Sequence, residues 1–191
     1  DFAEDSLGYI DCANPRSCYP ESKRAAETLC VSYAKQYAVD ALIARPCHVY
    51  GPTITDENSR ADAQFLRNAL DGQNIVMKSA GSQVRSYLYV SDAAAAMLHL
   101  LVHGESAAAY NLANPDSVMS IREYAQLLAD CAGVELRTEL PSDVELAGFS
   151  KVTRATFDVK KLMNTGFVPQ YAPELGVRQM IEILRNVTPV K

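Results

Sequence analysis

The sequence predicts a mixed α/β fold, and three observations support this prediction. Helix-like and strand-like segments alternate along most of the 191 residues. The short apolar segment 41–44 directly follows a long helical pattern, as expected of a strand buried on both faces of a parallel sheet. Hydrophobic residues make up 48% and charged residues 21% of the chain, which is typical of one globular domain or of part of a larger one.

The first fifty residues predict one helix followed by one buried strand. Residues 1–16 read as a loop, because glycine, asparagine and proline favour turns there. Ser17 is expected to cap a helix that runs to about residue 38. The strand 41–44 follows and leads into residues 47–52, which are expected to be a strand end and a turn. A helix joined to a buried strand is half of a parallel α/β unit.

The rest of the chain predicts helices that alternate with short strands. Helices are expected at 60–70, 92–102, 121–132 and 173–186, with a short one opening at Asp158. Strands are expected at 75–77, 83–90, 109–113 and 134–140. Ser91 is expected to cap the second of these helices, and Ser120 with Glu123 forms a capping box for the third. This part of the chain is predicted to be a smaller lobe packed on the first unit.

Charge and hydropathy exclude some classes of partner. The net charge is −5 and there is no long Lys/Arg run, which argues against nucleic acid or an anionic membrane as the main partner. The longest apolar run, 93–102, contains His99 and is too short to span a bilayer. No secretory signal is visible, so a cytoplasmic location is expected.

The cysteines and histidines do not predict a disulfide framework or a metal site. The five cysteines include no Cys-x-x-Cys pair, so reduced thiols are expected. His99 and His103 have metal-like spacing, but no acidic zinc pattern accompanies them. Helix packing is therefore the favoured interpretation of this pair.

Tyr19 and Lys23 are the first candidate catalytic residues. They are four apart in the predicted first helix, so both lie on one helix face. An ammonium there favours ionisation of a phenol, whose ordinary pKa is about 10. Such a tyrosine can take or return a hydroxyl proton near neutral pH. The alternative is a surface helix that carries both residues without a catalytic role.

Five segments together give the chain a family resemblance. They are Tyr19-x-x-x-Lys23, Ala44-Arg-Pro-Cys-His-Val-Tyr-Gly-Pro52, Gly81-Ser-Gln-Val-Arg-Ser-Tyr-Leu-Tyr-Val-Ser-Asp92, Tyr110-Asn-Leu-Ala113 and Phe157-Asp-Val-Lys-Lys-Leu. In this order the chain resembles the second half of the extended short-chain dehydrogenases/reductases, the NAD-dependent nucleotide-sugar epimerases/dehydratases. The resemblance implies the C-terminal portion of a Rossmann-type parallel sheet with a smaller α/β substrate-binding lobe. Residues 1–52 would be the remnant of the dinucleotide-binding core and 53–191 mainly the nucleotide-sugar lobe.

The chain departs from this family at the glycine-rich loop that binds the cofactor pyrophosphate. None of its nine glycines forms a Gly-x-x-Gly-x-x-Gly pattern. The Ser/Thr catalytic partner of the family would also lie before Asp1. The chain is therefore expected to be the C-terminal portion of a larger enzyme, inactive alone and with weak or absent NAD binding.

The resemblance also implies roles for individual residues. Tyr19 would be the general base, and Lys23 would lower its pKa and bind the nicotinamide ribose. Tyr19, Lys23, Pro46 and Val49 would contact NAD. The residues expected to contact substrate are His48, Phe65, Leu66, Val76, Lys78, Arg85 and Arg154, with Arg60 as a further candidate. Packing remains the alternative for several of them, above all for Phe65, Leu66 and His48.

Two of these substrate candidates depart from the pattern of relatives. His48 stands where relatives commonly carry an asparagine that touches the substrate, and its charge depends on pH. Lys78 stands where relatives often carry an aromatic residue, which leaves the nucleotide base open. Arg85 fits the pattern, because a guanidinium offers paired donors to a diphosphate.

The implied function is modification of a nucleotide sugar by transient oxidation at the sugar C4. A dTDP-glucose 4,6-dehydratase-like or 4-epimerase reaction is favoured. The alternatives are a UDP-glucuronate decarboxylase-like enzyme, or an inactive fragment that only binds a nucleotide diphosphate. The choice between NAD and NADP stays open, as do the base and the sugar. Relatives commonly dimerise through the Tyr/Lys helix, so Leu29, Tyr33 and Tyr37 are expected to face a partner subunit in a homodimer.

Overall fold

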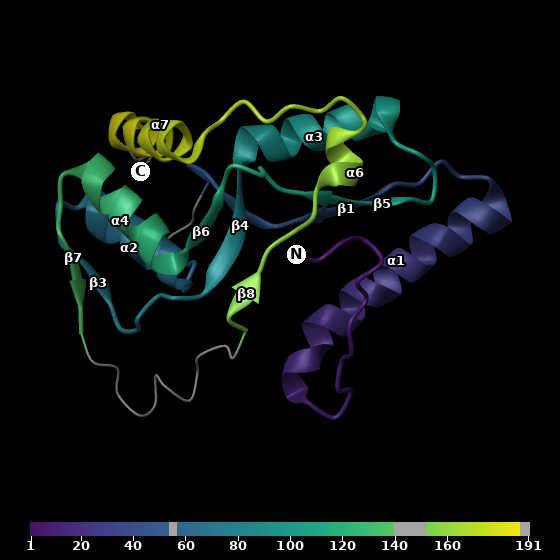
Figure 1. The fold of residues 1–191 in the computed structure, drawn as a ribbon, viewed down its shortest axis with the longest axis horizontal. Helices are drawn as coiled ribbons and strands as arrows, with labels where there is room; N and C mark the ends of the chain where they lie inside the picture. The colour runs from purple at the N-terminus through teal and green to yellow at the C-terminus, as the bar shows by residue number, and fades with distance from the viewer. Residues whose placement is uncertain (54–56, 140–151, 188–191) are drawn as a thin grey trace.

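The computed structural model describes residues 1–53, 57–139 and 152–187. Two groups of elements are visible in it (Figure 1). One group contains α1 (Cys18–Tyr37), β1 (Ile43–Pro46), α3 (Val90–His103), β5 (Ala109–Leu112) and α6 (Lys160–Met163). The other contains α2 (Ala61–Leu70), β3 (Ile75–Met77), α4 (Ile121–Ala132), β7 (Leu136–Thr138) and α7 (Pro173–Asn186). Between the groups lie β2 (His48–Tyr50), β4 (Val84–Tyr89), β6 (Val118–Ser120) and β8 (Arg154–Ala155). The mixed α/β fold is therefore confirmed.

Most strand pairs are parallel. β1 pairs with β5, β2 with β4, β3 with β7 and β8 with β4, whereas β6 is antiparallel to β4. The strands β1 and β2 follow one another in a single extended run. Cys47 stands between them, and its N–H donates to the carbonyl of Leu112 at 2.9 Å. The run therefore leaves β5 and joins β4 at the point where the predicted site residues lie.

Two hydrophobic clusters form the core. One is built from α2, α4 and α7 with aromatic residues of β2 and β4, and its fully buried members include Leu66, Leu128 and Met180. The other is built from α3, β5 and α6, with Leu100 and Leu112 fully or almost fully buried. Strand β1 of the predicted segment 1–52 pairs with β5 of the predicted segment 53–191, so both segments contribute to one sheet. The domain boundary at residue 52 stays a prediction.

Helix α1 differs from the other long helices, because none of its residues is buried. Figure 1 shows it beside β1, apart from the other helices. Arg45 of β1 binds it: Nε and Nη2 donate to the two carboxylate oxygens of Glu27 at 2.8 and 2.6 Å. Nη1 of Arg45 donates to the carbonyl of Glu4 at 2.7 Å. The hydrogen bond with Glu27 raises the pKa of Arg45, so the guanidinium stays charged.

Local sequence signals predicted several elements correctly. The helices at 61–70, 121–132 and 173–186 were expected within one residue of their observed bounds. The capping box of α4 is present: Glu123 N–H donates to Ser120 Oγ at 3.1 Å, and Ser120 N–H donates to Glu123 Oε2 at 2.6 Å. The strands at 75–77, 84–89 and 109–112 also agree with expectation.

Other predictions about elements were wrong. The first strand is 43–46 rather than 41–44, and the strand end expected within 47–52 is a separate strand, β2, because β4 supplies a pairing partner. Ser17 occupies the N-cap position of α1, as expected, but its hydroxyl makes no capping bond and donates instead to the carbonyl of Asp11 at 2.5 Å. α3 begins at Val90 with Tyr89, not Ser91, at the cap position.

The end of the chain holds further differences. β7 covers only 136–138 of the expected strand 134–140, and residue 140 lies outside the described residues. α6 begins at Lys160, and the Asp158 carboxylate accepts from the Lys160 N–H at 2.9 Å. The short strands β6 and β8 were not expected.

Candidate active site

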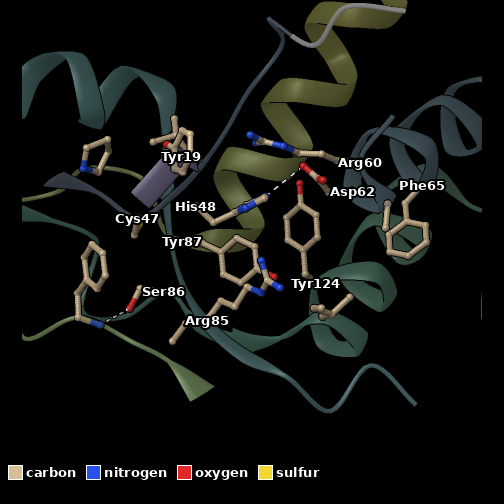
Figure 2. Close-up of a pocket in the computed structure, with 16 residues that line it drawn as sticks. Tyr19, Cys47, His48, Arg60, Asp62, Phe65, Arg85, Ser86, Tyr87 and Tyr124 are labelled. Atoms are coloured by element: carbon tan, nitrogen blue, oxygen red, sulfur yellow. Dashed lines mark hydrogen bonds and ion pairs between the residues drawn. The ribbon is translucent and has the colours of Figure 1, made fainter. Parts of the chain in front are cut away.

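A cavity of about 790 Å³ lies where the β1–β2 run, β4 and the first turns of α2 and α4 meet (Figure 2). Helix α1 reaches it with Tyr19. Seven residues that the sequence singled out line this cavity: Tyr19, Pro46, His48, Val49, Arg60, Phe65 and Arg85. They come from four segments of the chain, so the fold assembles a site that is scattered in the sequence.

Tyr19 lies in the first turn of α1, and 69% of it is exposed. The ammonium nitrogen of Lys23 lies over its ring, 5.5 Å from the ring centroid. This confirms that the two side chains share one helix face. Lys23 itself is not among the residues that line the cavity. The pair therefore presents a phenol to the cavity with a cation behind it.

His48 and Asp62 form a hydrogen-bonded contact on the cavity wall. His48 Nε2 lies 3.1 Å from Asp62 Oδ2, and both side chains are mostly buried. Burial raises the pKa of Asp62, but the hydrogen bond with His48, together with a backbone hydrogen bond and the nearby charge of Arg60, outweighs it, and the net effect is a lowered pKa. Asp62 was not singled out from the sequence, because an acidic residue in the first turn of a helix is an ordinary partner of the helix dipole.

Stacked tyrosines close one side of the cavity. The rings of Tyr87 and Tyr124 are 4.9 Å apart and nearly parallel, at 12°. The ring of His48 meets Tyr87 edge-on, at 5.1 Å and 72°. Burial raises the pKa of Tyr87 to about 12 and that of Tyr124 well above its ordinary value. These phenols keep their protons, so Tyr19 is the better candidate for a base.

Two arginines give the cavity positive charge. Arg85 extends from β4, and its guanidinium donates to Gln83 Oε1 at 3.0 Å. Arg60 occupies the N-cap position of α2, whose N-terminus adds a partial positive charge. Cys47 also lines the cavity, and burial raises the pKa of its thiol to about 12. The thiol is therefore protonated and a poor nucleophile.

Four substrate candidates lie away from the cavity lining. Leu66 is fully buried in the core on the inner face of α2. Val76 is half-buried on β3, and Lys78 is exposed just after that strand. Arg154 of β8 is ion-paired with Asp1 at 3.0 Å. None of the four is among the residues that line the cavity, and their roles stay predictions.

The other residues that line the cavity were not singled out as site candidates from the sequence. They are Cys47, Ala61, Asp62, Ser86, Tyr87, Ile121, Tyr124, Ala155 and Phe157. Some of them, such as Ser86, lie in the segments of the family resemblance: Ser86 is buried and accepts from the Phe157 N–H at 3.0 Å, which joins β4 to the segment after β8. Others, such as Asp62 and Tyr124, come from α2 and α4, and tertiary packing brings them to the site.

Residues 1–53, 57–139 and 152–187 hold no group of three or more His, Cys, Asp or Glu side chains that could bind a metal ion. None of the helices in this part of the chain is long and apolar enough to cross a membrane.

Comparison with known proteins supports the fold and identifies the family. Residues 2–113 match the model of the NAD dependent epimerase/dehydratase family. UDP-glucuronic acid decarboxylase 1 of Xenopus tropicalis is 33% identical over 96% of this chain, which spans 42% of that relative. The structure of RMD from Pseudomonas aeruginosa complexed with NADPH is 27% identical, with a TM-score of 0.74 over 96% of this chain and 63% of that one.

A further solved structure supports the fold alone. dTDP-glucose 4,6-dehydratase from Bacillus anthracis in complex with NAD is 21% identical, with a TM-score of 0.73 over 92% of this chain and 57% of that one. The predicted fold class and family resemblance are thus confirmed, and the chain spans less than two thirds of the length of each of these relatives. The chain belongs to the NAD dependent epimerase/dehydratase family.

Proposed function

We propose that this chain serves an NAD-dependent modification of a nucleotide-diphosphate sugar that begins with oxidation at the sugar C4. The observation that supports it most is that Tyr19, His48 and Arg85 line one cavity. A base, a hydrogen-bonding group and a cation for phosphate are the groups that such a substrate requires. The full-length protein is expected to be the active enzyme.

The residues near Tyr19 fit the nicotinamide end of NAD. Pro46 and Val49 line the same cavity as Tyr19 and offer it apolar surface at the carboxyl end of β1, where parallel sheets bind ligands. When bound, NAD would accept the hydride from C4. Tyr19 would take the hydroxyl proton, and the Lys23 ammonium would favour the phenolate and bind the ribose.

The substrate would lie against the other side of the cavity. Arg85 would bind the diphosphate with paired N–H donors, and Arg60 at the start of α2 would add a second cation. Phe65 lines the cavity and would contact the nucleotide. Contacts of Leu66, Val76, Lys78 and Arg154 with the nucleotide are also proposed, and alanine variants would test them through the affinity for UDP and dTDP.

The reaction that follows oxidation has two candidates. The 4,6-dehydratase or 4-epimerase reaction is supported by the match to the NAD dependent epimerase/dehydratase family. Decarboxylation is supported by 33% to 35% identity with UDP-glucuronic acid decarboxylases. Incubation of the full-length protein and NAD with UDP-glucuronate, dTDP-glucose and UDP-glucose separates them. Release of CO2 indicates a decarboxylase, loss of water a dehydratase and inversion at C4 an epimerase. No reaction with any of the three would contradict the proposal.

The chain alone is proposed to bind a nucleotide diphosphate without stable NAD binding or turnover. It contains no glycine-rich loop to receive the pyrophosphate of NAD. Calorimetric titration is expected to detect UDP or dTDP binding and no NAD binding. Micromolar affinity for NAD would contradict this part of the proposal.

A homodimer through α1 is also proposed. Leu29, Tyr33 and Tyr37 are 54% to 59% exposed on that helix, and the rings of the two tyrosines are 5.2 Å apart. Such an apolar stripe favours burial against a second copy. Sedimentation is expected to give the mass of a dimer, and a strictly monomeric mass would contradict the proposal.

A further inference from the structure

The contact between His48 and Asp62 is held in place from several sides. His48 is fixed by the pairing of β2 with β4, where it lies opposite Tyr87. Asp62 comes from the first turn of α2, and its Oδ2 lies 3.1 Å from His48 Nε2. In Figure 2 the two side chains point toward one another across the cavity wall, and the hydroxyl of Tyr124 points toward Asp62. Packing therefore restricts the imidazole ring to one orientation.

The charges around this pair explain how the Asp62 carboxylate can lie in a cavity that is proposed to bind a diphosphate, which is also negatively charged. Among the described residues that line the cavity, one is acidic, and it is Asp62. Arg60 and Arg85 face the same space, whereas Cys47, Tyr87 and Tyr124 keep their protons because burial raises their pKa values. An unpaired carboxylate would repel a diphosphate, and the hydrogen bond to His48 offsets part of this cost.

The contact also determines where the imidazole carries its proton. A carboxylate accepts hydrogen bonds and donates none when ionised, so His48 Nε2 must carry the proton. In a neutral imidazole the other nitrogen, Nδ1, is then an acceptor. Among residues 1–53, 57–139 and 152–187, no group donates a hydrogen bond to His48 Nδ1. That acceptor is available to a ligand.

We propose that Asp62 is a positioning residue that holds the proton of His48 on Nε2, so that Nδ1 accepts a hydrogen bond from a hydroxyl of the bound nucleotide sugar. The proposal rests on the proposed function, because it names the contact that this site makes with the sugar. The proposed contact differs from the one that an asparagine would make at position 48. An asparagine amide offers a donor and an acceptor, whereas a neutral imidazole held by Asp62 offers the ligand an acceptor.

The position of the proton can be tested without any ligand. Long-range proton–nitrogen NMR of the chain distinguishes the two imidazole tautomers, and His48→Asn assigns the His48 signals by their loss. The expected result is the Nε2–H tautomer in the native chain and a mixture in Asp62→Ala. His99 is the internal control, since its Nε2 contacts the Thr165 carbonyl at 3.1 Å and its tautomer should not change. An Nδ1–H tautomer of His48, or no change in Asp62→Ala, would overturn the proposal.

The contact with the sugar is tested by comparing UDP with UDP-glucose as probes of the full-length protein. Asp62→Ala is expected to weaken UDP-glucose binding relative to UDP binding by about 3- to 10-fold, the effect of one hydrogen bond, because the loss of the carboxylate charge acts on both probes alike. In the His48→Asn background the same change should not alter the ratio of the two affinities. Equal effects on UDP and UDP-glucose would overturn the proposal. Failure of the native protein to bind UDP would instead contradict the proposed function. If Asp62→Ala does not fold, Asp62→Leu, whose side chain is of similar size and cannot accept a hydrogen bond, replaces it in the binding test.

Discussion

Helix α1 and the helices α2, α4 and α7 are stabilised in opposite ways. α1 buries none of its residues and is bound to β1 by the contacts of Arg45. The other three helices share a core in which Leu66, Leu128 and Met180 are fully buried. The tyrosines of the two regions differ accordingly: Tyr19 is exposed on α1, whereas burial raises the pKa of Tyr124 on α4. A tyrosine side chain is therefore suited to proton transfer where it is exposed, as on α1, and to packing where it is buried, as on α4.

The largest expected effect is on activity and comes from α1. Tyr19→Phe in the full-length protein should lower turnover about 10²- to 10⁴-fold, because a general base is lost. Its thermal stability should not change, since the hydroxyl has no hydrogen-bond partner among residues 1–53, 57–139 and 152–187. Tyr33→Phe on the same helix is the matched control and should keep full turnover. If Tyr19→Phe retained a third of the activity, Tyr19 would not be the base.

The second largest effect is on stability and comes from the core that α2, α4 and α7 share. Leu128→Ala should lower the free energy of unfolding by about 2–5 kcal/mol, because it leaves a cavity in a closely packed core. Lys35→Ala on the exposed surface of α1 is the matched control, with an expected change within about 0.5 kcal/mol. Urea denaturation measures both. Equal effects of the two substitutions would contradict the view that the core shared by α2, α4 and α7 contributes more stability than the exposed face of α1.

The third prediction concerns the attachment of α1. Arg45→Gln removes charge-assisted hydrogen bonds to Glu27 and to the Glu4 carbonyl. Such bonds contribute about 1.5–3 kcal/mol each when buried, and less here because the pair is partly exposed. Hydrogen exchange should become faster in α1 and stay unchanged in α4. Equal acceleration in both helices would contradict the view that they are stabilised independently.

The smallest effect comes from the capping box of α4. Ser120→Ala should cost about 1 kcal/mol of stability. Hydrogen bonds from the backbone and the hydroxyl of Ser120 lower the pKa of Glu123. Glu123 therefore contributes stability above its unfolded pKa of about 4.3, and this contribution is lost as the pH falls through the lower folded pKa. The cost of Glu123→Ala, measured by thermal unfolding, should shrink between neutral pH and pH 3. A cost that stays constant over this range would contradict the assignment.

The elements that sequence predicted well are those with local signals. Ser120 and Glu123 mark the start of α4, and Pro173 marks the start of α7, because caps and prolines act within one turn of the helix. β6 and β8 contain three and two residues and carry no such signal. They exist as strands because β4 lies beside them, which depends on contacts between residues distant in the chain.

The residues of the candidate site also fall into two groups, those in segments that the sequence identifies and those outside such segments. Tyr19, Pro46, His48 and Arg85 belong to recognisable segments, and all four line the cavity. Asp62 and Tyr124 do not belong to such segments. They reach the cavity because α2 and α4 pack together with their first turns toward it, and sequence spacing does not predict that packing.

The extended run 43–50 restricts how this protein can evolve. Its first part pairs with β5, its second part pairs with β4, and Cys47 lies at the change between them. Adding or deleting one residue there would turn every following side chain to the opposite face of the strand. Pro46, His48 and Val49 could then no longer share one cavity. Natural variants are therefore expected to diversify this site by substitution, while insertions and deletions accumulate in segments that pair with neither sheet.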